Sequence, residues 1–315
     1  FNFIDSIKFT DKNPYSKINL VYPNDIDESY GYYIVDKLNN LSNQLSLENS
    51  FQLAHHYDLS RIRKDDKRHW ILLNNTNTVS NESNFSKLNS LKSYSLTSVK
   101  NISKLTVYNQ CNISLGISFL LCQMSLLMIN DKRKFIEFKE TLKLQYLNLF
   151  ESFSFIEKSE IIKDELIRAI KYINRKNNYK ILGSGVNYNS AKFASKQMTQ
   201  LFGTAWAFDV LENHKHIDIS AEAVCMVLIH NIWRQGYQND VLPEIEKLVS
   251  HENIPIIVTN QGDDRFDLIE MKINWKNNDY EIINIPVIKL PKINEEFVFL
   301  LNNFFFNYFS EQLRK

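Results

Sequence analysis

Short apolar runs alternate with segments of helical spacing in the first half of the chain. A helical pattern spans Tyr30 to Leu41, and a strongly apolar segment at 112–130 predicts a buried helix. Four further runs have the length and the β-rich composition of strands, namely 17–22, 50–60, 68–73 and 101–108. Strands that alternate with helices are typical of a mostly parallel sheet with helices on both faces.

The second half repeats this order after a stretch of helical spacing at 134–176. Helices are expected at 189–206 and 295–313, because apolar residues recur there at helical spacing. Strand signals, two of them running into loops, occur at 178–185, 223–231, 252–262 and 280–290. Four prolines are expected at the turns and edges of these strands, namely Pro243, Pro255, Pro286 and Pro291.

Two similar α/β halves indicate a duplicated domain rather than a solenoid, whose repeats are shorter. The first domain is expected at 1–150 and the second at 179–315. A helical bridge at 151–178 joins them. Each domain is expected to have its own mostly parallel sheet with helices on both faces.

The charge balance narrows the choice of partners. Lysine and arginine total 37 against 36 for aspartate and glutamate, a formal net charge of +1 at pH 7. A nearly neutral chain lacks the basic excess that binds nucleic acid or an acidic membrane surface. The apolar segment at 113–129 contains serines and a glutamine, and it is too short and too polar for a membrane span. We therefore expect neither nucleic acid nor membrane as a partner.

Cysteine usage indicates a reducing compartment. The three cysteines lie far apart and form neither a CxxC motif nor a disulfide framework. The opening segment FNFIDSIKF has no basic region followed by an apolar one, so we expect no signal peptide. These features predict a cytoplasmic protein.

Metal-ligating residues are not grouped at suitable spacings. His214 and His216 are two residues apart, but no carboxylate or cysteine would complete a metal site with them. The acidic stretch at 263–267 is expected to form a solvated turn. We predict a protein without metal or cofactor.

The most informative stretch is ILGSGVNYNSAKFASKQMTQ, residues 181–200. The chain has only seven glycines, yet Gly183 and Gly185 lie one residue apart, between a strand and a helix. Glycine there lets an anionic ligand approach the backbone at a helix start. A dinucleotide fingerprint is excluded because Tyr188 occupies the position of its third glycine, and a phosphate-binding P-loop is excluded because no Gly-Lys pair follows either glycine at the required spacing. A tight turn without a ligand remains the alternative.

With the following VLENHKH, this stretch resembles the second domain of the double-SIS (sugar isomerase) proteins. That family includes the isomerase half of glucosamine-6-phosphate synthase and the fructosamine-6-phosphate deglycases. It typically shows G-x-G-x-x-Y, then a helix with a glutamate, then a K-H pair. Glycines 183 and 185, Tyr188 and Ala191 match the first motif, and Lys215 and His216 match the K-H pair. In the first domain, Ser29-Tyr30 and ILLNNTNT stand where the family has Ser-Tyr and a serine- and threonine-rich phosphate loop.

The resemblance implies two flavodoxin-like α/β domains and a phosphosugar site. The binding residues that it implies are Ser29, Asn74, Thr76, Thr78, Ser80, Gly183, Gly185 and Tyr188. The catalytic positions that it implies are His216, for ring opening or proton transfer, and the helix glutamate, which is Gln200 here. An amide cannot take up a proton at neutral pH, so a neighbouring carboxylate such as Glu212 would have to act as base.

Three functions are open at this level. The first is a protein that binds a phosphorylated sugar or amino sugar and has lost isomerase chemistry. The second is an active aldose–ketose phosphosugar isomerase or a fructosamine-6-phosphate deglycase with a displaced base. The third is a structural or interaction protein without a ligand. The resemblance also implies a homodimer, since SIS proteins commonly build the site between subunits.

Overall fold

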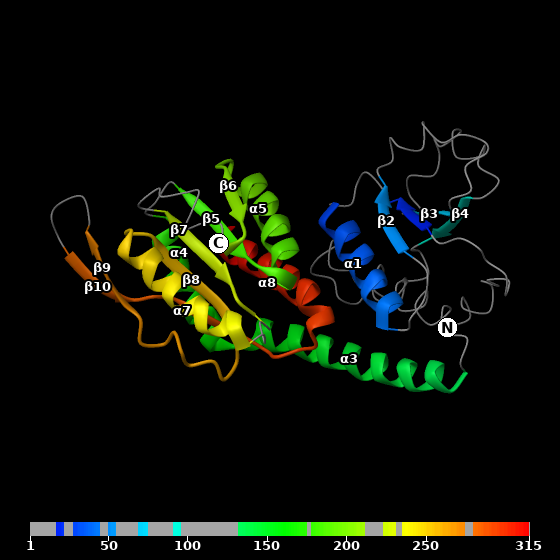
Figure 1. Cartoon of the computed structure of the whole chain (residues 1–315). Coiled ribbons are helices and arrows are strands. Elements are labelled where there is room, and N and C mark those ends of the chain that lie inside the picture. Colours follow the sequence, from blue (N-terminus) through cyan, green and yellow to red (C-terminus); the bar gives the residue numbers. More distant parts are fainter. Residues whose placement is uncertain are drawn as a thin grey trace. The chain divides into compact units, whose positions relative to one another are not determined.

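The computed structural model describes ten segments of the chain: residues 17–21, 28–44, 50–54, 69–74, 91–95, 132–174, 178–211, 223–230, 235–274 and 280–314. The chain divides into two compact units, Phe1–Leu144 and Gln145–Lys315 (Figure 1). The division falls inside helix α3, Lys132–Lys158. The expected helical bridge therefore begins within a helix that both units share, and its role as a separate bridge stays a prediction.

The first unit contains a parallel four-stranded sheet in the order β2-β1-β3-β4. Helix α1, Glu28–Gln44, follows the first strand. The four strands are β1 (Lys17–Val21), β2 (Ser50–Ala54), β3 (His69–Asn74) and β4 (Leu91–Ser95). The predicted strands at 17–22, 50–60 and 68–73 and the helix at 30–41 are confirmed in these segments, although β2 ends at Ala54. The predicted strand at 101–108 and helix at 112–130 lie outside the described residues.

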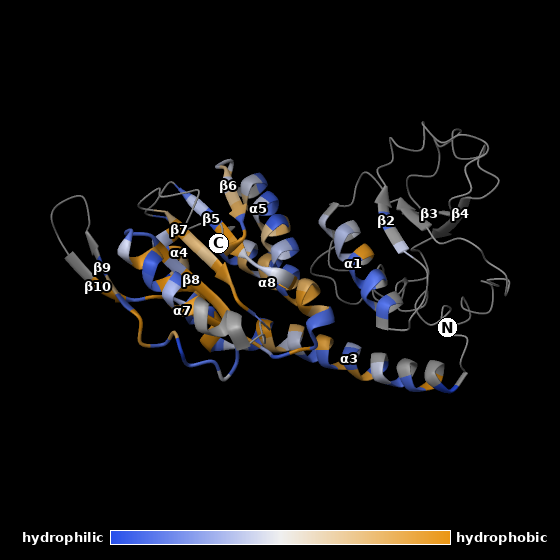
Figure 2. Ribbon diagram, in the orientation of Figure 1, coloured by the Kyte–Doolittle hydropathy of each residue, from blue (hydrophilic) through white to orange (hydrophobic). Residues whose placement is uncertain are grey.

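The second unit contains a parallel five-stranded sheet in the order β11-β8-β7-β5-β6. Its strands are β5 (Tyr179–Gly183), β6 (Trp206–Asp209), β7 (Val224–Leu228), β8 (Ile254–Asn260) and β11 (Val287–Leu290). Every residue of β5, β7 and β8 is buried, and Figure 2 shows apolar colouring along β7 and much of β8. Strands buried on both faces explain why these runs are mostly apolar and do not alternate.

The strand order in the second unit is flavodoxin-like. With only the strands of this sheet numbered along the chain, the order reads 2-1-3-4-5, and the sheet of the first unit shows the same order for its four strands. The chain leaves β5 toward β6 on one side and later crosses from β7 to β8 on the other side. The order therefore reverses between β5 and β7, and ligands of open α/β sheets bind at the carboxyl ends of such strands.

Helices cover both faces of the second sheet. Because crossovers are right-handed, α5 (Tyr188–Phe202) and α7 (Gln235–Ser250) lie on opposite faces. Helix α8, Val298–Arg314, packs beside α5, where Phe193 and Phe299 meet edge to face. The stacked rings of Phe153 and Phe304 join α8 to α3, and α4 (Glu160–Ile173) contacts both α8 and β11. Residues 298–310 are all buried, so α8 is part of the core.

Helix α5 ends earlier than the sequence predicts. Gly203 adopts a left-handed conformation, φ 64°, and its N–H donates to the Thr199 carbonyl oxygen at 3.0 Å. This C-cap stops the helix at Phe202, and the residues expected to extend it to 206 lead instead into β6. The expected helix at 189–206 is therefore wrong in its last turn.

The expected single strand at 280–290 is two strands that belong to different sheets. Strand β10, Tyr280–Asn284, pairs antiparallel with β9, Glu270–Asn274, and β11 begins only at Val287. Pro286 lies between them and has no N–H to continue a ladder. The β9–β10 hairpin thus stands in the connection from β8 to β11, where a helix commonly crosses over (Figure 1).

Two of the four prolines lie inside regular elements rather than beside strands. Pro243 lies inside α7, and Pro255 is the second residue of β8. The prediction that all four flank the strands is therefore wrong for Pro243 and too narrow for Pro255. Pro286 and Pro291 do flank β11.

Candidate functional site

The Gly-rich turn lies at the carboxyl end of β5, beside the point where the strand order reverses. Its first glycine, Gly183, has no room for a side chain: a β-carbon there would lie 2.7 Å from the backbone oxygen of Asn187. Gly185 needs glycine for a different reason, because its φ of 56° is in the left-handed region, although no atom lies within 4 Å of where its β-carbon would be. The two positions therefore require glycine for different physical reasons, packing at Gly183 and backbone conformation at Gly185.

The turn closes through its own backbone and leads directly into α5. The Asn187 N–H donates to the Ser184 carbonyl oxygen at 3.1 Å, and residues 185–187 form a short 3-10 helix, η6. Ser184 has the extended backbone of an N-cap residue, but its side chain makes no cap hydrogen bond. Its hydroxyl oxygen instead accepts from the Leu211 N–H at 3.1 Å. The helical start is therefore not capped by either Ser184 or Asn187.

A buried polar cluster lies behind this turn. The side-chain amide of Asn187 donates to the backbone oxygen of His230 at 2.9 Å, just beyond the end of β7. The amide of Asn302 on α8 donates to the Asn187 side-chain oxygen at 2.8 Å and to Ser190 Oγ at 3.4 Å. All four side chains are completely buried. The cluster joins the turn, the neighbouring strand β7 and helix α8.

His230 is neutral in this setting. Its Nε2 lies 2.9 Å from the backbone oxygen of Pro291, and since a carbonyl oxygen only accepts, Nε2 carries the proton. Burial lowers the pKa of His230 to about 4, although the Pro291 carbonyl and the Asn302 side chain both favour the charged form. In the neutral ring Nδ1 is an acceptor, as is Asn302 Oδ1, and among the described residues neither atom has a hydrogen-bond partner. His230 thus joins β7 to the segment after β11 without carrying a charge.

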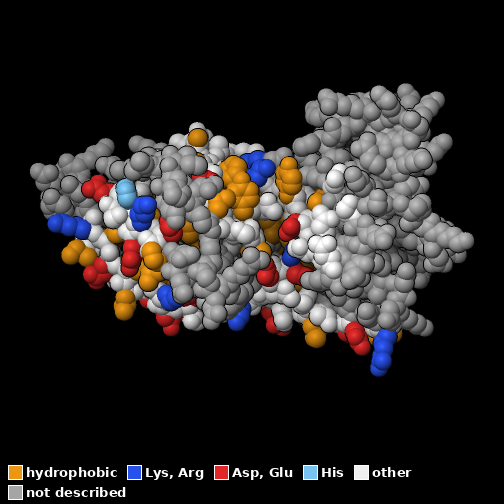
Figure 3. Space-filling model, in the orientation of Figure 1, with side chains coloured by type: hydrophobic (Ala, Val, Ile, Leu, Met, Phe, Trp, Pro, Cys, Tyr) orange, Lys and Arg blue, Asp and Glu red, His pale blue; other side chains and the backbone are white. Residues whose placement is uncertain are grey.

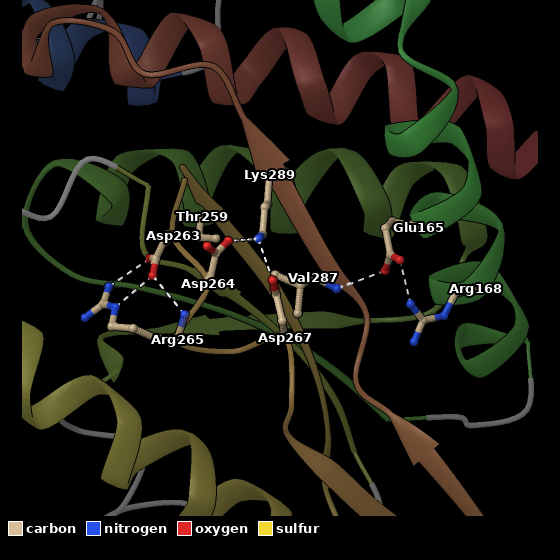
Figure 4. Close-up of polar contacts among 9 residues, drawn as sticks. All are labelled: Glu165, Arg168, Thr259, Asp263, Asp264, Arg265, Asp267, Val287 and Lys289. Carbon is tan, nitrogen blue, oxygen red and sulfur yellow. Dashed lines mark hydrogen bonds and ion pairs between the residues drawn. The ribbon is translucent and has the colours of Figure 1, made fainter. Parts of the chain in front are cut away.

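The turn after β8, whose polar contacts Figure 4 shows, is only partly solvated. Asp263, whose side chain is 13% exposed, accepts from Thr259 Oγ1 at 2.6 Å and from Arg265 at 2.8 Å. Burial raises the pKa of Asp263, but the hydrogen bonds from Arg265 and Thr259 outweigh it and lower the pKa overall. Asp264 is largely exposed. The sequence-based prediction of a solvated turn is correct for Asp264 and wrong for Asp263.

A lysine on β11 holds the same turn from the other side. Lys289 Nζ donates to Asp264 at 2.5 Å and to Asp267 at 2.7 Å (Figure 4). Burial lowers the pKa of Lys289, but these two carboxylates outweigh it and raise the pKa. Nearby, Glu165 of α4 accepts from the Val287 N–H at 3.0 Å, which joins that helix to the start of β11. The lysine contacts join β11 to the turn after β8, and the Glu165 contact joins α4 to the start of β11.

The predicted binding residues fall into three groups. In the first unit, Ser29 is buried in the first turn of α1 and Asn74 is the last residue of β3, so both belong to the carboxyl edge of that sheet. In the second unit, Gly183 and Gly185 form the turn, and Tyr188 is the first residue of α5. The Tyr188 side chain is 37% exposed, with its ring 6.0 Å from that of Phe208. The remaining predicted residues, Thr76, Thr78 and Ser80, lie outside the described residues.

Of the predicted catalytic residues, only Gln200 lies within the described part of the chain. It is exposed in the last turn of α5, about three helical turns from the Gly-rich turn at the other end of that helix. Glu212 and His216 lie outside the described residues. Their roles stay predictions, as does the placement of Lys215.

Sequence reasoning missed the buried cluster. Two signals were present: a histidine closes the apolar run at 223–231, and asparagines interrupt the otherwise apolar helix after 297. A polar side chain in a fully apolar segment must find a hydrogen-bond partner or lose free energy. Neither signal identifies the partner residue, because the hydrogen-bonded Asn187 and Asn302 are 115 residues apart in the sequence.

Neither a metal site nor a membrane-spanning helix is found among the described residues. Within the described residues, no group of three or more His, Cys, Asp or Glu side chains is arranged to hold a metal ion. No helix in the described segments is long and apolar enough to cross a membrane. On the face drawn in Figure 3, basic and acidic side chains of the described residues are interspersed rather than gathered by sign.

Comparison with known proteins supports the fold. No family model and no curated protein matches the sequence. Among solved structures, the C-terminal domain of glucosamine-fructose-6-phosphate aminotransferase from Francisella tularensis has a TM-score of 0.62 at 11% identity, covering 95% of this chain and 85% of that one. Tagatose-6-phosphate ketose/aldose isomerase from Escherichia coli has a TM-score of 0.58 at 12% identity, covering 95% and 82%. At such identities the likeness shows the fold alone, and that fold is the mostly parallel, flavodoxin-like α/β fold expected from the sequence.

Proposed function

We propose that the chain binds a phosphorylated sugar or amino sugar at the turn between β5 and α5 and has lost isomerase chemistry. The observation that carries this proposal is the geometry of the turn: it lies where the strand order reverses, no atom lies within 4 Å of where a β-carbon on Gly185 would be, and Ser184 does not cap the helical start. Uncapped N–H groups at a helix start suit a phosphate. The two neighbours described above are named for 6-phosphosugars, which is consistent with this ligand class.

The proposed loss of catalysis rests on one residue, Gln200. The position that resembles the family's general base is Gln200, whose amide cannot accept a proton at neutral pH. The alternative, an active isomerase or deglycase, rests on Lys215 and His216, which keep the K-H pair, with Glu212 as a displaced base. From the resemblance we further propose that the protein is a homodimer and that it is cytoplasmic. The mass in solution, measured by sedimentation, tests the homodimer.

Thermal unfolding with a panel of sugars tests the binding. The panel contains fructose 6-phosphate, glucosamine 6-phosphate and fructosamine 6-phosphate, each with its unphosphorylated counterpart as matched control. A ligand at about 100 times its Kd stabilises the folded state by about 2.7 kcal/mol, which raises Tm by several degrees. A rise with one phosphosugar and none with its counterpart supports the proposal. No rise across the panel at millimolar concentration contradicts it and favours a structural protein.

A turnover assay with the same three phosphosugars separates the two remaining functions. We expect no isomerisation or deglycation above the uncatalysed rate. Robust turnover by the wild-type chain contradicts the proposed loss of catalysis. In that case Glu212→Gln and His216→Ala are the variants to examine, because they remove the carboxylate and the imidazole that the alternative requires.

A further inference from the structure

Helix α8 contains buried asparagines with very different surroundings. Asn302 and Asn303 are adjacent and at most 1% exposed. Asn302 donates to Asn187 and Ser190, whereas neither amide atom of Asn303 has a hydrogen-bond partner among the described residues. Burying an amide costs free energy unless it is hydrogen-bonded. The partners of Asn302 therefore distinguish it from its neighbour in the sequence.

The hydrogen-bond directions in this cluster are fixed by chemistry. The His230 carbonyl can only accept, so the Asn187 amide nitrogen must face it. The side-chain oxygen of Asn187 then faces Asn302, which must present its own amide nitrogen. Each asparagine orientation follows from the preceding one, starting at the backbone of β7. Reversing one amide would oppose two acceptors or two donors in a buried site.

Asn187 is also the residue whose backbone oxygen covers Gly183. Its N–H closes the turn onto Ser184. Holding the Asn187 side chain therefore holds the peptide that packs over the first glycine and forms the last residue of η6. Asn302 reaches this residue from the opposite end of the unit's sequence, so α8 holds the Asn187 side chain that bonds to the backbone beyond β7.

We propose that Asn302 is a positioning residue for phosphosugar binding, which acts through Asn187 to hold the turn at 183–187 in its binding conformation. This inference rests on the proposed function of the same turn and adds the residue that presets its geometry. Asn302 does not touch the ligand. Removing its donor leaves the Asn187 oxygen buried without a partner, and the turn then relaxes toward arrangements that the ligand must reorganise on binding.

The test compares variants at adjacent positions in the full-length chain. Asn302→Ala removes the donor, and Asn302→Leu removes it while filling the volume, so a cavity cannot account for both results. Asn303→Ala is the matched control, because it truncates an equally buried amide that makes no hydrogen bond within the described residues. The probes are fructose 6-phosphate and glucosamine 6-phosphate, with Kd measured by calorimetry. The exchange rates of backbone amide hydrogens in a peptide covering 183–190 are measured in parallel.

We expect both Asn302 variants to weaken probe binding by about tenfold relative to Asn303→Ala, and to speed amide exchange in the 183–190 peptide. Equal Kd values for the Asn302 and Asn303 variants overturn the inference. If the wild type binds neither probe, the proposed function fails, and amide exchange alone decides whether Asn302 holds the turn. Exchange in 183–190 that is faster only in the Asn302 variants supports the positioning role, and equal exchange rejects it.

Discussion

The backbone oxygen of Asn187 lies 2.7 Å from the position that a β-carbon on Gly183 would occupy. Real β-carbons do not approach a backbone oxygen so closely, and the obstructing atom belongs to a peptide that is hydrogen-bonded and cannot swing away. The same Asn187 is held on its other side by His230 and Asn302. Gly183 is therefore required by packing, independently of any ligand.

Substitution of the two glycines separates packing from backbone conformation. Gly183→Ala is expected to destabilise the protein by about 1–3 kcal/mol, because the added methyl group overpacks a buried turn. Gly185→Asn is expected to cost less than about 1 kcal/mol, since the space is open and asparagine tolerates positive φ. Urea unfolding of the two variants measures the difference. Similar losses for both would contradict the packing argument.

His230 predicts a specific loss of stability in acid. Its pKa is about 4 in the folded protein against an ordinary value of 6.5, so the unfolded chain binds a proton first. The contribution of neutral His230 to the free energy of unfolding is fully present above about pH 6.5 and is lost as the pH falls toward 4. The loss is on the order of 3 kcal/mol over this interval. Unfolding free energies measured from pH 7 to pH 4 record it.

The matched variant for this prediction is His230→Gln, whose amide nitrogen can still donate to the Pro291 carbonyl. Carboxylates that titrate in the same range contribute equally to both proteins. The difference between wild type and variant therefore isolates the histidine. We expect the wild type to lose more stability than His230→Gln between pH 6.5 and 4, and parallel curves would show that His230 takes up its proton without penalty.

The turn after β8 predicts unequal effects for two adjacent aspartates. Asp263→Asn is expected to cost about 1–3 kcal/mol, because the carboxylate accepts charged and neutral hydrogen bonds in a partly buried position. Asp264→Asn is expected to cost no more than about 0.5 kcal/mol, because its ion pair with Lys289 is largely exposed. Chemical unfolding at pH 7 compares them. A larger effect at position 264 would reverse the assignment.

The asparagines of α8 predict opposite effects of the same substitution. Asn303→Leu is expected to raise the free energy of unfolding by about 1 kcal/mol, because it replaces a buried amide that lacks partners with an apolar side chain of similar size. Asn307→Leu is expected to lower it by about 1–3 kcal/mol, because Gln197 loses the acceptor of its amide hydrogen bond. The sign of each change in Tm checks the pair.

The sequence by itself determined the elements whose residues are buried on both faces. Strand β7 is a continuous apolar run and β5 and β8 are mostly apolar, a pattern that follows from burial in a parallel sheet. The Gly-rich turn was also predictable, because two glycines between a strand and a helix have few other uses. From these features alone, a mostly parallel α/β fold could be expected.

Elements with little apolar character were decided by their tertiary partners. Strand β4 has the sequence LKSYS, and its parallel ladder to β3 is what makes it a strand. Strand β6 begins inside the stretch predicted as helix, because the left-handed Gly203 ends α5 and residues 203–205 lead into the strand. Strand β9 becomes extended by pairing with β10. Local propensity is weak where cross-strand hydrogen bonds supply the stability.

In the buried cluster, too, the sequence determines one part of the arrangement and the tertiary structure the other. The sequence places His230 at the end of an apolar strand and Asn302 in an apolar helix, so it determines that both must find partners. Which partners they find depends on how strands β5 and β7 and helix α8 are brought together. Hydrogen bonds between residues 43 and 115 positions apart leave no local pattern, and only the tertiary structure shows that they meet at Asn187.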